Sequence, residues 1–357
     1  MARSRPAVAL DIGSSHVKLL ELEVDRAGKH RLKHFGVAPL PPEAIVDGAF
    51  MNTTAIVSTV RELLARHKVK TKEAVVGVSG NSVIVKRISL PLMTQEELDE
   101  SIQWEAEQYI PFDVNDVNID AYILQGQADD AGQMEVLLVA ARKELINEYT
   151  SLVLEAGLKP SVIDVAAFAM ENMFTLNYDP PPGAIALVNV GASMVNVNVL
   201  RRGVSAFTRD MGRDMGMGGR AYTEEIQRAM NVSYEEAEIF KTGGDKSDRA
   251  AVVPEEVERV LSSVSESMAT EINRTLDYYL STVGGEQLTR IYLCGGAAPT
   301  PGLRDVMERV CGCPVEVVDP FRRIHLDERA FNPRFLQDVA PQAAVAVGLG
   351  LRRADDK

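Results

Sequence analysis

A short polar loop between two apolar strands occurs twice in this sequence, and the repeat limits the fold more than any other feature. The first copy covers residues 7–24 with the loop DIGSS at 11–15. The second covers residues 184–200 with the loop NVGAS at 189–193, about 180 residues later. Solenoid repeats recur every ~20 to 50 residues, so this spacing instead indicates two related lobes. A chain of 357 residues is also longer than one compact core usually serves.

The first loop carries residue types suited to phosphate binding. Successive backbone N–H groups and the hydroxyls of Ser14 and Ser15 form the kind of concave turn that binds phosphate oxygens. A side chain at Gly13 would obstruct the phosphates. Asp11 could hold Mg²⁺ through water, since this ion prefers one or two carboxylates and keeps its own waters. Lys18 could neutralise phosphate charge, although an ordinary hairpin turn has the same composition as this loop.

Three such loops, in order, resemble the actin, Hsp70 and sugar-kinase superfamily of ATP-binding folds. The resemblance implies that two phosphate loops grip the nucleotide and that a third, glycine-rich loop receives the adenosine. It places Asp164 in the first connecting segment, as a candidate catalytic acid beside Asp11, and residues 343–348 in the second. By this resemblance the first loop is formed by Asp11, Gly13, Ser14, Ser15 and Lys18, the second by Asn189, Gly191, Ala192 and Ser193, and the adenosine loop by Gly295, Gly296 and Ala297.

The segment AEIFK at residues 237–241 resembles a helical motif of the same superfamily whose Glu and Lys reach the ribose and base. A spacing of three puts Glu238 and Lys241 on one helical face. An exposed ion pair would have the same pattern.

Longer motifs resemble the PilM family of type IV pilus assembly proteins, which is similar in turn to the cell-division protein FtsA. The resemblance covers nearly the whole chain, with WEAEQYIPF at 104–112 its most specific piece. The motifs are DIGSSHVKLLEL, WEAEQYIPF, IDVAAFAMEN, AEIFK, LCGGAAPTPGL and AVAVGLGLR. The resemblance implies a cytoplasmic scaffold that accepts the N-terminal cytoplasmic tail of the inner-membrane protein PilN beside an extra subdomain. It also implies links to the pilus motor and inner-membrane platform, and a homo-oligomer or ring.

The fold class we expect is α/β: a two-lobed actin-like fold with an FtsA-type inserted subdomain. Consecutive prolines at 180–182 forbid helix and ladder pairing and mark the boundary between the lobes. The first lobe core is expected at 1–83 and 161–182, the inserted subdomain at 84–160, the second lobe core at 183–210 and 288–352, and a helical subdomain at 211–287.

One departure from the superfamily pattern concerns catalysis. Its active ATPases usually have Asp at the start of the second phosphate loop, where this chain has Asn189. An amide cannot supply full negative charge to Mg²⁺-bound water or accept a proton as a general base. We therefore expect ATP or ADP to bind with Mg²⁺, with weak or no turnover.

Charge and hydropathy exclude several function classes. A net charge of −13 disfavours nucleic-acid binding and direct contact with anionic lipid. No stretch approaches the roughly 20 apolar residues that span a bilayer, the start does not resemble a signal peptide, and the short acidic end does not resemble a membrane-binding helix. Membrane association is thus expected through a partner. Cys311 and Cys313 lack further nearby ligands for zinc.

Two alternatives stay open. A small-molecule kinase of the same fold would need an acceptor pocket with a carboxylate base, for which Asp164 is the candidate. An FtsA-like filament former would assemble on addition of ATP.

Overall fold

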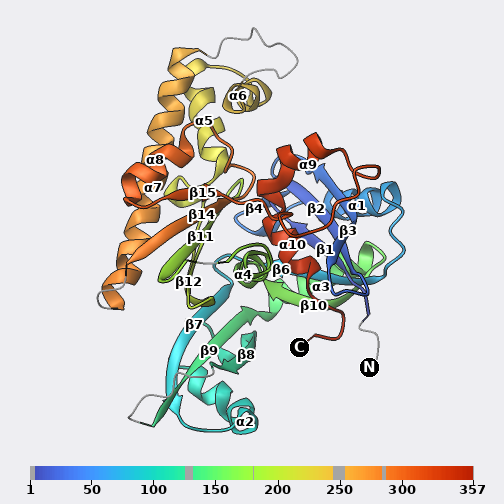
Figure 1. The fold of residues 1–357 in the computed structure, drawn as a ribbon, viewed down its shortest axis with the longest axis vertical. Coiled ribbons are helices and arrows are strands. Elements are labelled where there is room, and N and C mark those ends of the chain that lie inside the picture. Colours follow the sequence, from blue (N-terminus) through green and yellow to red (C-terminus); the bar gives the residue numbers. More distant parts are fainter. Residues whose placement is uncertain (1–4, 125–131, 180, 244–253, 284–286, 357) are drawn as a thin grey trace.

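The computed structural model describes residues 5–124, 132–179, 181–243, 254–283 and 287–356. Two five-stranded sheets share one topology (Figure 1). In each, three antiparallel strands are followed by a parallel strand beside the first, and a further parallel strand completes the sheet. The first sheet has the order β10-β6-β1-β2-β3 and contains Val8–Ile12 (β1), His16–Val24 (β2), His30–Pro39 (β3), Glu73–Val78 (β6) and Lys159–Val165 (β10).

The second sheet repeats this arrangement and so confirms the two related lobes expected from the repeated loop. Its order is β13-β12-β11-β14-β15, with Ala184–Val190 (β11), Val195–Arg201 (β12), Val204–Met211 (β13), Leu288–Cys294 (β14) and Val315–Val317 (β15). Central strand β11 is almost entirely apolar because helices cover both faces of its sheet.

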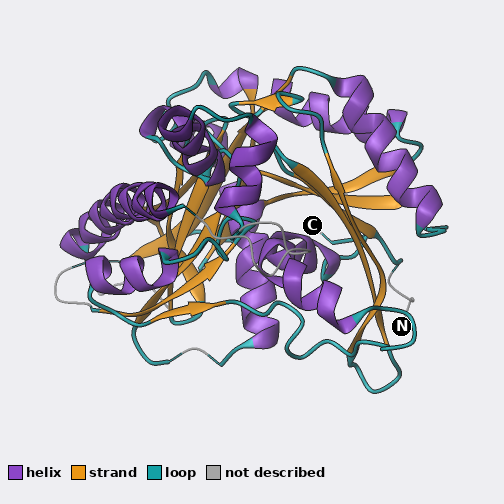
Figure 2. Cartoon of the chain, turned by 90° about the horizontal axis from the view of Figure 1, so that it is seen from above, coloured by secondary structure: helices purple, strands orange, loops and turns teal. Residues whose placement is uncertain are grey.

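Helices lie both outside the two sheets and between them (Figure 2). On the first sheet, Thr53–Arg66 (α1) and Lys143–Glu155 (α3) cover the outer face. On the second, Gly219–Met230 (α5), Glu255–Thr282 (α7) and Leu303–Cys311 (α8) cover the outer face, and Tyr234–Lys241 (α6) packs beside them. Shorter elements are β4 (Ile45–Val46), β5 (Ala49–Phe50), α9 (Pro333–Val339) and 3-10 turns at Val114–Asp116, Arg213–Met215 and Ala340–Ala343.

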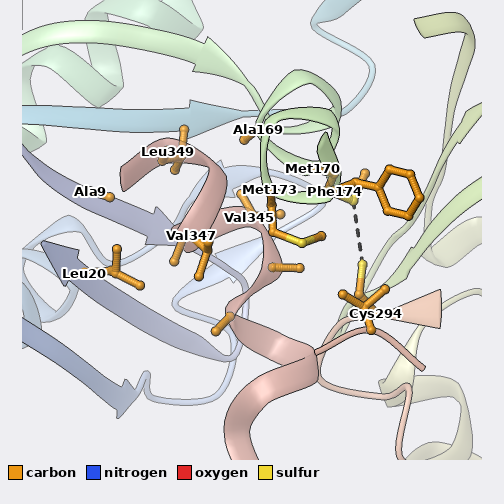
Figure 3. Packing of buried hydrophobic residues seen from close by; sticks show 14 of the residues in the cluster. Ala9, Leu20, Ala169, Met170, Met173, Phe174, Cys294, Val345, Val347 and Leu349 are labelled. Carbon is orange, nitrogen blue, oxygen red and sulfur yellow. Dashed lines mark hydrogen bonds between the residues drawn. The ribbon is translucent and has the colours of Figure 1, made fainter. Parts of the chain in front are cut away.

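Two short helices cross between the sheets, and Figure 3 shows their packing. Ala166–Asn177 (α4) and Ala344–Gly350 (α10) share one buried cluster with residues of both sheets. Their backbones approach closely at Gly348, where a Cβ atom would lie 1.7 Å from the carbonyl oxygen of Ala169. The small residues of α10 therefore allow close packing against α4, and the second connecting segment expected at 343–348 lies between the lobes.

A third sheet projects from the first lobe (Figure 1). It has the order β7-β9-β8, with Val83–Pro91 (β7), Gln133–Arg142 (β9) and Val117–Ile123 (β8), and Gln95–Ala106 (α2) covers one face. A capping box between Thr94 and Glu97 begins α2.

Helix α3 falls inside the range 84–160 that we assigned to the inserted subdomain, but its buried side chains pack elsewhere. Tyr149, Leu152 and Val153 lie in the core of the first lobe with Leu10 and Ile56. The packing thus connects α3 to the first lobe, and the full division of the chain into subdomains stays a proposal. Within the described ranges, no helix is long and apolar enough to cross a membrane.

Candidate functional site

A cavity of about 460 Å³ lies between the two lobes, where the repeated loops face each other. Its wall contains every residue that the sequence suggested for nucleotide binding. These are Asp11, Gly13, Ser14, Ser15, Lys18, Asn189, Gly191, Ala192, Ser193, Glu238, Lys241, Gly295, Gly296 and Ala297. Segments far apart in the chain therefore form one site.

The first loop is a tight turn between β1 and β2. The backbone N–H of Gly13 donates to the carbonyl of His16 across 3.1 Å. Asp11 and Lys18 are paired across the two strands, and Lys18 Nζ lies 3.1 Å from Asp11 Oδ2. Both side chains are largely buried, so the lysine neutralises the aspartate inside the cavity. His16 also faces the cavity, and burial together with the charge of Lys18 lowers its pKa.

The second loop repeats the geometry of the first. Gly191 N–H donates to the carbonyl of Met194 across 2.9 Å, as Gly13 does in the first lobe. The hydroxyls of Ser14 and Ser193 lie 2.8 Å apart. Arg220, on α5, donates to the carbonyl of Ser14 across 3.1 Å. The two loops thus lie opposite each other with hydroxyls and backbone amides between them.

A chain of side-chain hydrogen bonds begins at Asn189. Asn189 Nδ2 donates to Asn196 Oδ1 across 2.9 Å, and Asn196 Nδ2 donates to Asp210 Oδ1 across 2.7 Å. Asp210 Oδ2 accepts from the backbone N–H of Gly80 in the first lobe across 2.5 Å. Burial raises the pKa of Asp210. The sequence reasoning missed Asn196 and Asp210, and the alternating amides of β12 were a visible signal for Asn196 alone.

The third loop follows β14 and depends on a glycine in the left-handed region. Gly295 has φ 99°, and a Cβ there would lie 2.3 Å from the carbonyl oxygen of Val190. Its N–H donates to the carbonyl of Pro341 across 2.7 Å, and Ala297 N–H donates to Val190 across 3.0 Å. The bond to Val190 holds the glycine loop against the second phosphate loop, and the bond to Pro341 ties it to the 3-10 turn before α10.

Glu238 and Lys241 lie on one face of α6, as their spacing indicated. Lys241 Nζ lies 2.5 Å from Glu238 Oε1 and 2.9 Å from Thr223 Oγ1. The lysine is largely buried and the glutamate is about one-third exposed at the cavity wall. This ion pair is consequently placed at the site rather than on the outer surface of the protein.

Asp164 does not line the cavity. It lies buried on β10, where its Oδ2 is 3.5 Å from Arg352 Nη1 and its Oδ1 accepts from Val165 N–H across 2.8 Å. Burial raises its pKa, against the opposing charge of Arg352. The contacts therefore support a structural ion pair with the C-terminal segment, and the catalytic role that we considered for Asp164 gains no support. A small-molecule kinase would also lack its expected base in the cavity.

Direct metal coordination finds no basis in the described part of the chain. No group of three or more His, Cys, Asp or Glu side chains there could hold a metal ion. Cys313 is buried and Cys311 is half-buried, both as free thiols. Mg²⁺ in nucleotide sites needs fewer protein ligands, because it keeps its waters and is held by substrate phosphates together with one or two carboxylates. The Asp11 carboxylate in the cavity wall fits that requirement through water.

Comparison with known proteins bears on this site and this topology. The family model described as "Type IV pilus assembly protein PilM" matches residues 9–354. The chain belongs to the PilM family. A solved PilM-PilN type IV pilus biogenesis complex is similar to this PilM-family chain with a TM-score of 0.82 and 27% identity, covering 98% of this chain and 99% of that one.

More distant similarities agree with the fold. The cell division protein FtsA of Enterococcus hirae is 23% identical over 361 residues, which cover 90% of this chain and 79% of that protein. The ethanolamine utilization protein EutJ of Carboxydothermus hydrogenoformans has a TM-score of 0.58 and 16% identity, covering 97% of this chain and 89% of that one. This PilM-family chain thus has the actin-like fold that the three loops indicated.

Proposed function

We propose that this chain is a cytoplasmic, nucleotide-binding scaffold of type IV pilus assembly. It holds ATP or ADP with Mg²⁺ between its lobes, and it binds the N-terminal cytoplasmic tail of PilN. Through that partner it lies at the inner membrane and links the membrane complex to the pilus motor. Family membership supports the pilus role. The observation that carries the nucleotide role is the opposition of the two phosphate loops.

The shape and lining of the cavity support a nucleotide as the ligand. A volume of about 460 Å³ lies in the usual range for small-molecule sites. One part of the wall carries hydroxyls, backbone amides and Lys18, which suit phosphates. Another part carries Glu238, Lys241 and the loop at Gly295, which suit a ribose and base. The wall therefore offers polar groups both where the phosphates would lie and where the ribose and base would lie.

Partner binding is supported by the similar solved complex, which contains PilN. In this chain, three large apolar side chains of the inserted subdomain are strongly exposed. Trp104 is 80% exposed, and Leu92 and Tyr122 are each 60% exposed. Exposed side chains of this size offer apolar area for contact with a partner. Assembly into a homo-oligomer or ring stays a prediction that sedimentation with nucleotide tests.

Weak or absent turnover is part of the proposal, because Asn189 cannot accept a proton. Its amide donates to Asn196 instead. Electrostatic positioning is the main contribution of a protein to phosphoryl transfer, and an amide at position 189 supplies neither a charge nor a base there. Brisk ATP hydrolysis by the purified protein, abolished by Asp11→Ala, would contradict this part.

The test of the scaffold role uses a synthetic peptide of the PilN N-terminal tail, immobilised for pull-down with ADP or without nucleotide. A scrambled peptide is the control. Trp104 is the single tryptophan of the chain, so its fluorescence reports on the inserted subdomain. We expect capture by the native peptide, with a shift of the Trp104 emission to shorter wavelength if the peptide covers that residue. Failure to bind both with and without nucleotide would remove the main support for the scaffold role.

A further inference from the structure

The carboxylate of Asp210 faces the nucleotide cavity without a cation beside it. Both of its hydrogen-bond donors, Asn196 and the backbone of Gly80, are neutral. Among the residues that the structure describes, no lysine, arginine or histidine forms an ion pair with it, and no neighbouring charge contributes to its raised pKa. Asp210 is half-buried in the cavity wall, and a carboxylate withdrawn from water without a cation is costly. The position therefore calls for a cation when the site is in use.

The direction of the hydrogen-bond chain follows from this carboxylate. An ionised carboxylate only accepts hydrogen bonds, so Asn196 must turn its NH₂ group toward Asp210. Its Oδ1 then faces residue 189, which must donate. Asn189 does so, whereas an aspartate there would place two acceptors against each other. The amide at position 189 and the acid at position 210 thus depend on each other.

The two lobes place their acids in corresponding rows of the sheets. In the first lobe, Asp11 on the first strand is paired with Lys18 on the second. In the second lobe, the same row runs from Asn189 to Asn196 to Asp210, across three neighbouring strands. The first-lobe acid already has a lysine 3.1 Å away. The acid of the second lobe lies on the third strand instead, and among the described residues no lysine forms an ion pair with it.

We propose that Asp210 replaces the acid missing at position 189 and is the second-lobe carboxylate that faces the Mg²⁺ of a bound nucleotide. Asn196 and Asn189 are positioning residues that orient it. The proposal rests on the proposed nucleotide-binding function and adds the second-lobe residue that faces the metal ion. This carboxylate would repel phosphates that arrive without a cation. A divalent cation that keeps its waters compensates the negative charge of both the carboxylate and the phosphates.

The contact with Gly80 gives this carboxylate a second consequence. Gly80 lies between β6 and β7, where the chain enters the inserted subdomain. A hydrated cation beside Asp210 attracts the negative charge of its carboxylate, and this weakens the hydrogen bond that Oδ2 accepts from the Gly80 N–H. The carboxylate therefore connects the metal end of the cavity to the base of the subdomain that carries Trp104.

Calorimetric titration with ADP, once in Mg²⁺ and once in EDTA, tests the assignment on the full chain. In the wild type we expect Mg²⁺ to tighten ADP binding. Asp210→Asn should reduce this Mg²⁺-dependent gain in ADP affinity by about tenfold. Residues that act on a metal ion through its other ligands typically contribute at least this much to metal affinity. Its binding in EDTA should be at least as tight as that of the wild type, because the repulsion between the carboxylate and the phosphates is gone, and this binding also shows that the variant is folded. Electron paramagnetic resonance with Mn²⁺ and ADP should show a corresponding loss of protein-bound Mn²⁺.

Two further variants complete the design. Asp214→Asn removes an exposed acid at the same cavity and should leave the Mg²⁺ gain unchanged. Asn189→Asp combined with Asp210→Asn returns the acid to the first strand and should recover the gain. An equal gain in the wild type and Asp210→Asn, an equal loss in Asp214→Asn, or no recovery in the double variant overturns the assignment. Failure of the wild type to bind ADP in either buffer overturns the nucleotide function, and the assignment with it.

Discussion

The hydroxyls of Ser14 and Ser193 lie 2.8 Å apart although 179 positions separate them in the chain. Each belongs to a loop closed by the same glycine N–H to carbonyl bond. The repeat in the sequence has therefore become an opposed pair of loops around one cavity. Substitutions in the two loops and at the cavity wall should therefore weaken ligand binding, whereas substitutions elsewhere in the fold should leave it unchanged.

Lys18→Met should weaken both stability and nucleotide binding. It leaves the largely buried Asp11 without its cation, at a cost of roughly 3 kcal/mol of unfolding free energy. Urea denaturation measures this loss. The double variant Asp11→Asn/Lys18→Met removes both charges and should recover most of the stability without recovering ADP affinity. Recovery of both would show that neither charge serves the ligand.

Gly348→Ala should destabilise the protein more than a usual surface change. The new Cβ would lie 1.7 Å from the carbonyl oxygen of Ala169, so α4 and α10 must separate. Overpacking of this kind costs about 3 kcal/mol. Gly212→Ala is the matched control, because its nearest heavy atom is 4.0 Å from the new Cβ. Equal unfolding midpoints for the two variants would contradict this account of the helix crossing.

Lys241→Met should separate recognition of the nucleoside from recognition of the phosphates. Loss of a charged hydrogen bond to the ribose or base is worth about 1.5 kcal/mol, or roughly tenfold in ADP affinity. Inorganic pyrophosphate should bind the variant as it binds the wild type. Arg228→Met removes the cation of an i,i+3 pair on the exposed face of α5 and should change neither. A parallel loss of pyrophosphate binding would place Lys241 at the phosphates instead.

Unfolding free energy should depend on pH through Asp210 in the absence of Mg²⁺. Burial raises its pKa in the folded protein above the ordinary value of 3.8, so the folded state holds this proton more tightly than the unfolded state. The Asp210 contribution to stability is therefore largest at low pH and falls as pH rises from 3.8 through the raised pKa.

Asp210→Asn removes this dependence, and urea denaturation at several pH values measures it. The variant should show a flatter profile than the wild type, with Asp214→Asn as the control. An unchanged profile in Asp210→Asn would mean that the carboxylate carries no such penalty.

Local patterns in the sequence were enough to predict much of the fold. Alternating or continuous apolar runs around polar turns located the phosphate loops, because a strand–turn–strand unit is determined by adjacent residues. The capping box at Thr94, which begins α2, is likewise a local pattern of residues three positions apart. In contrast, the membership of α3 in the first-lobe core depends on packing over long sequence separations, which local periodicity does not report.

In the candidate site, too, some residues are identified by local motifs and others only by long-range strand pairing. The loop residues follow from motifs, whereas Asp210 reaches the cavity through the register of β12 with β13. Its sequence neighbourhood contains no signal that separates it from other strand-end acids. Asp164 is such an acid, and the register of β10 turns it toward Arg352 instead. Strand pairing, which is not visible in one sequence, thus decides which acid faces the ligand.

The most direct test of the central claim is a titration of the full-length protein with fluorescent ADP in Mg²⁺, followed by competition with unlabelled ADP. The account predicts saturable binding with one site per chain, displaced by unlabelled ADP and weakened at least tenfold in Lys18→Met. Absence of saturable binding, or binding that Lys18→Met and Asp11→Ala leave unchanged, would contradict the claim that the two opposed loops hold a nucleotide.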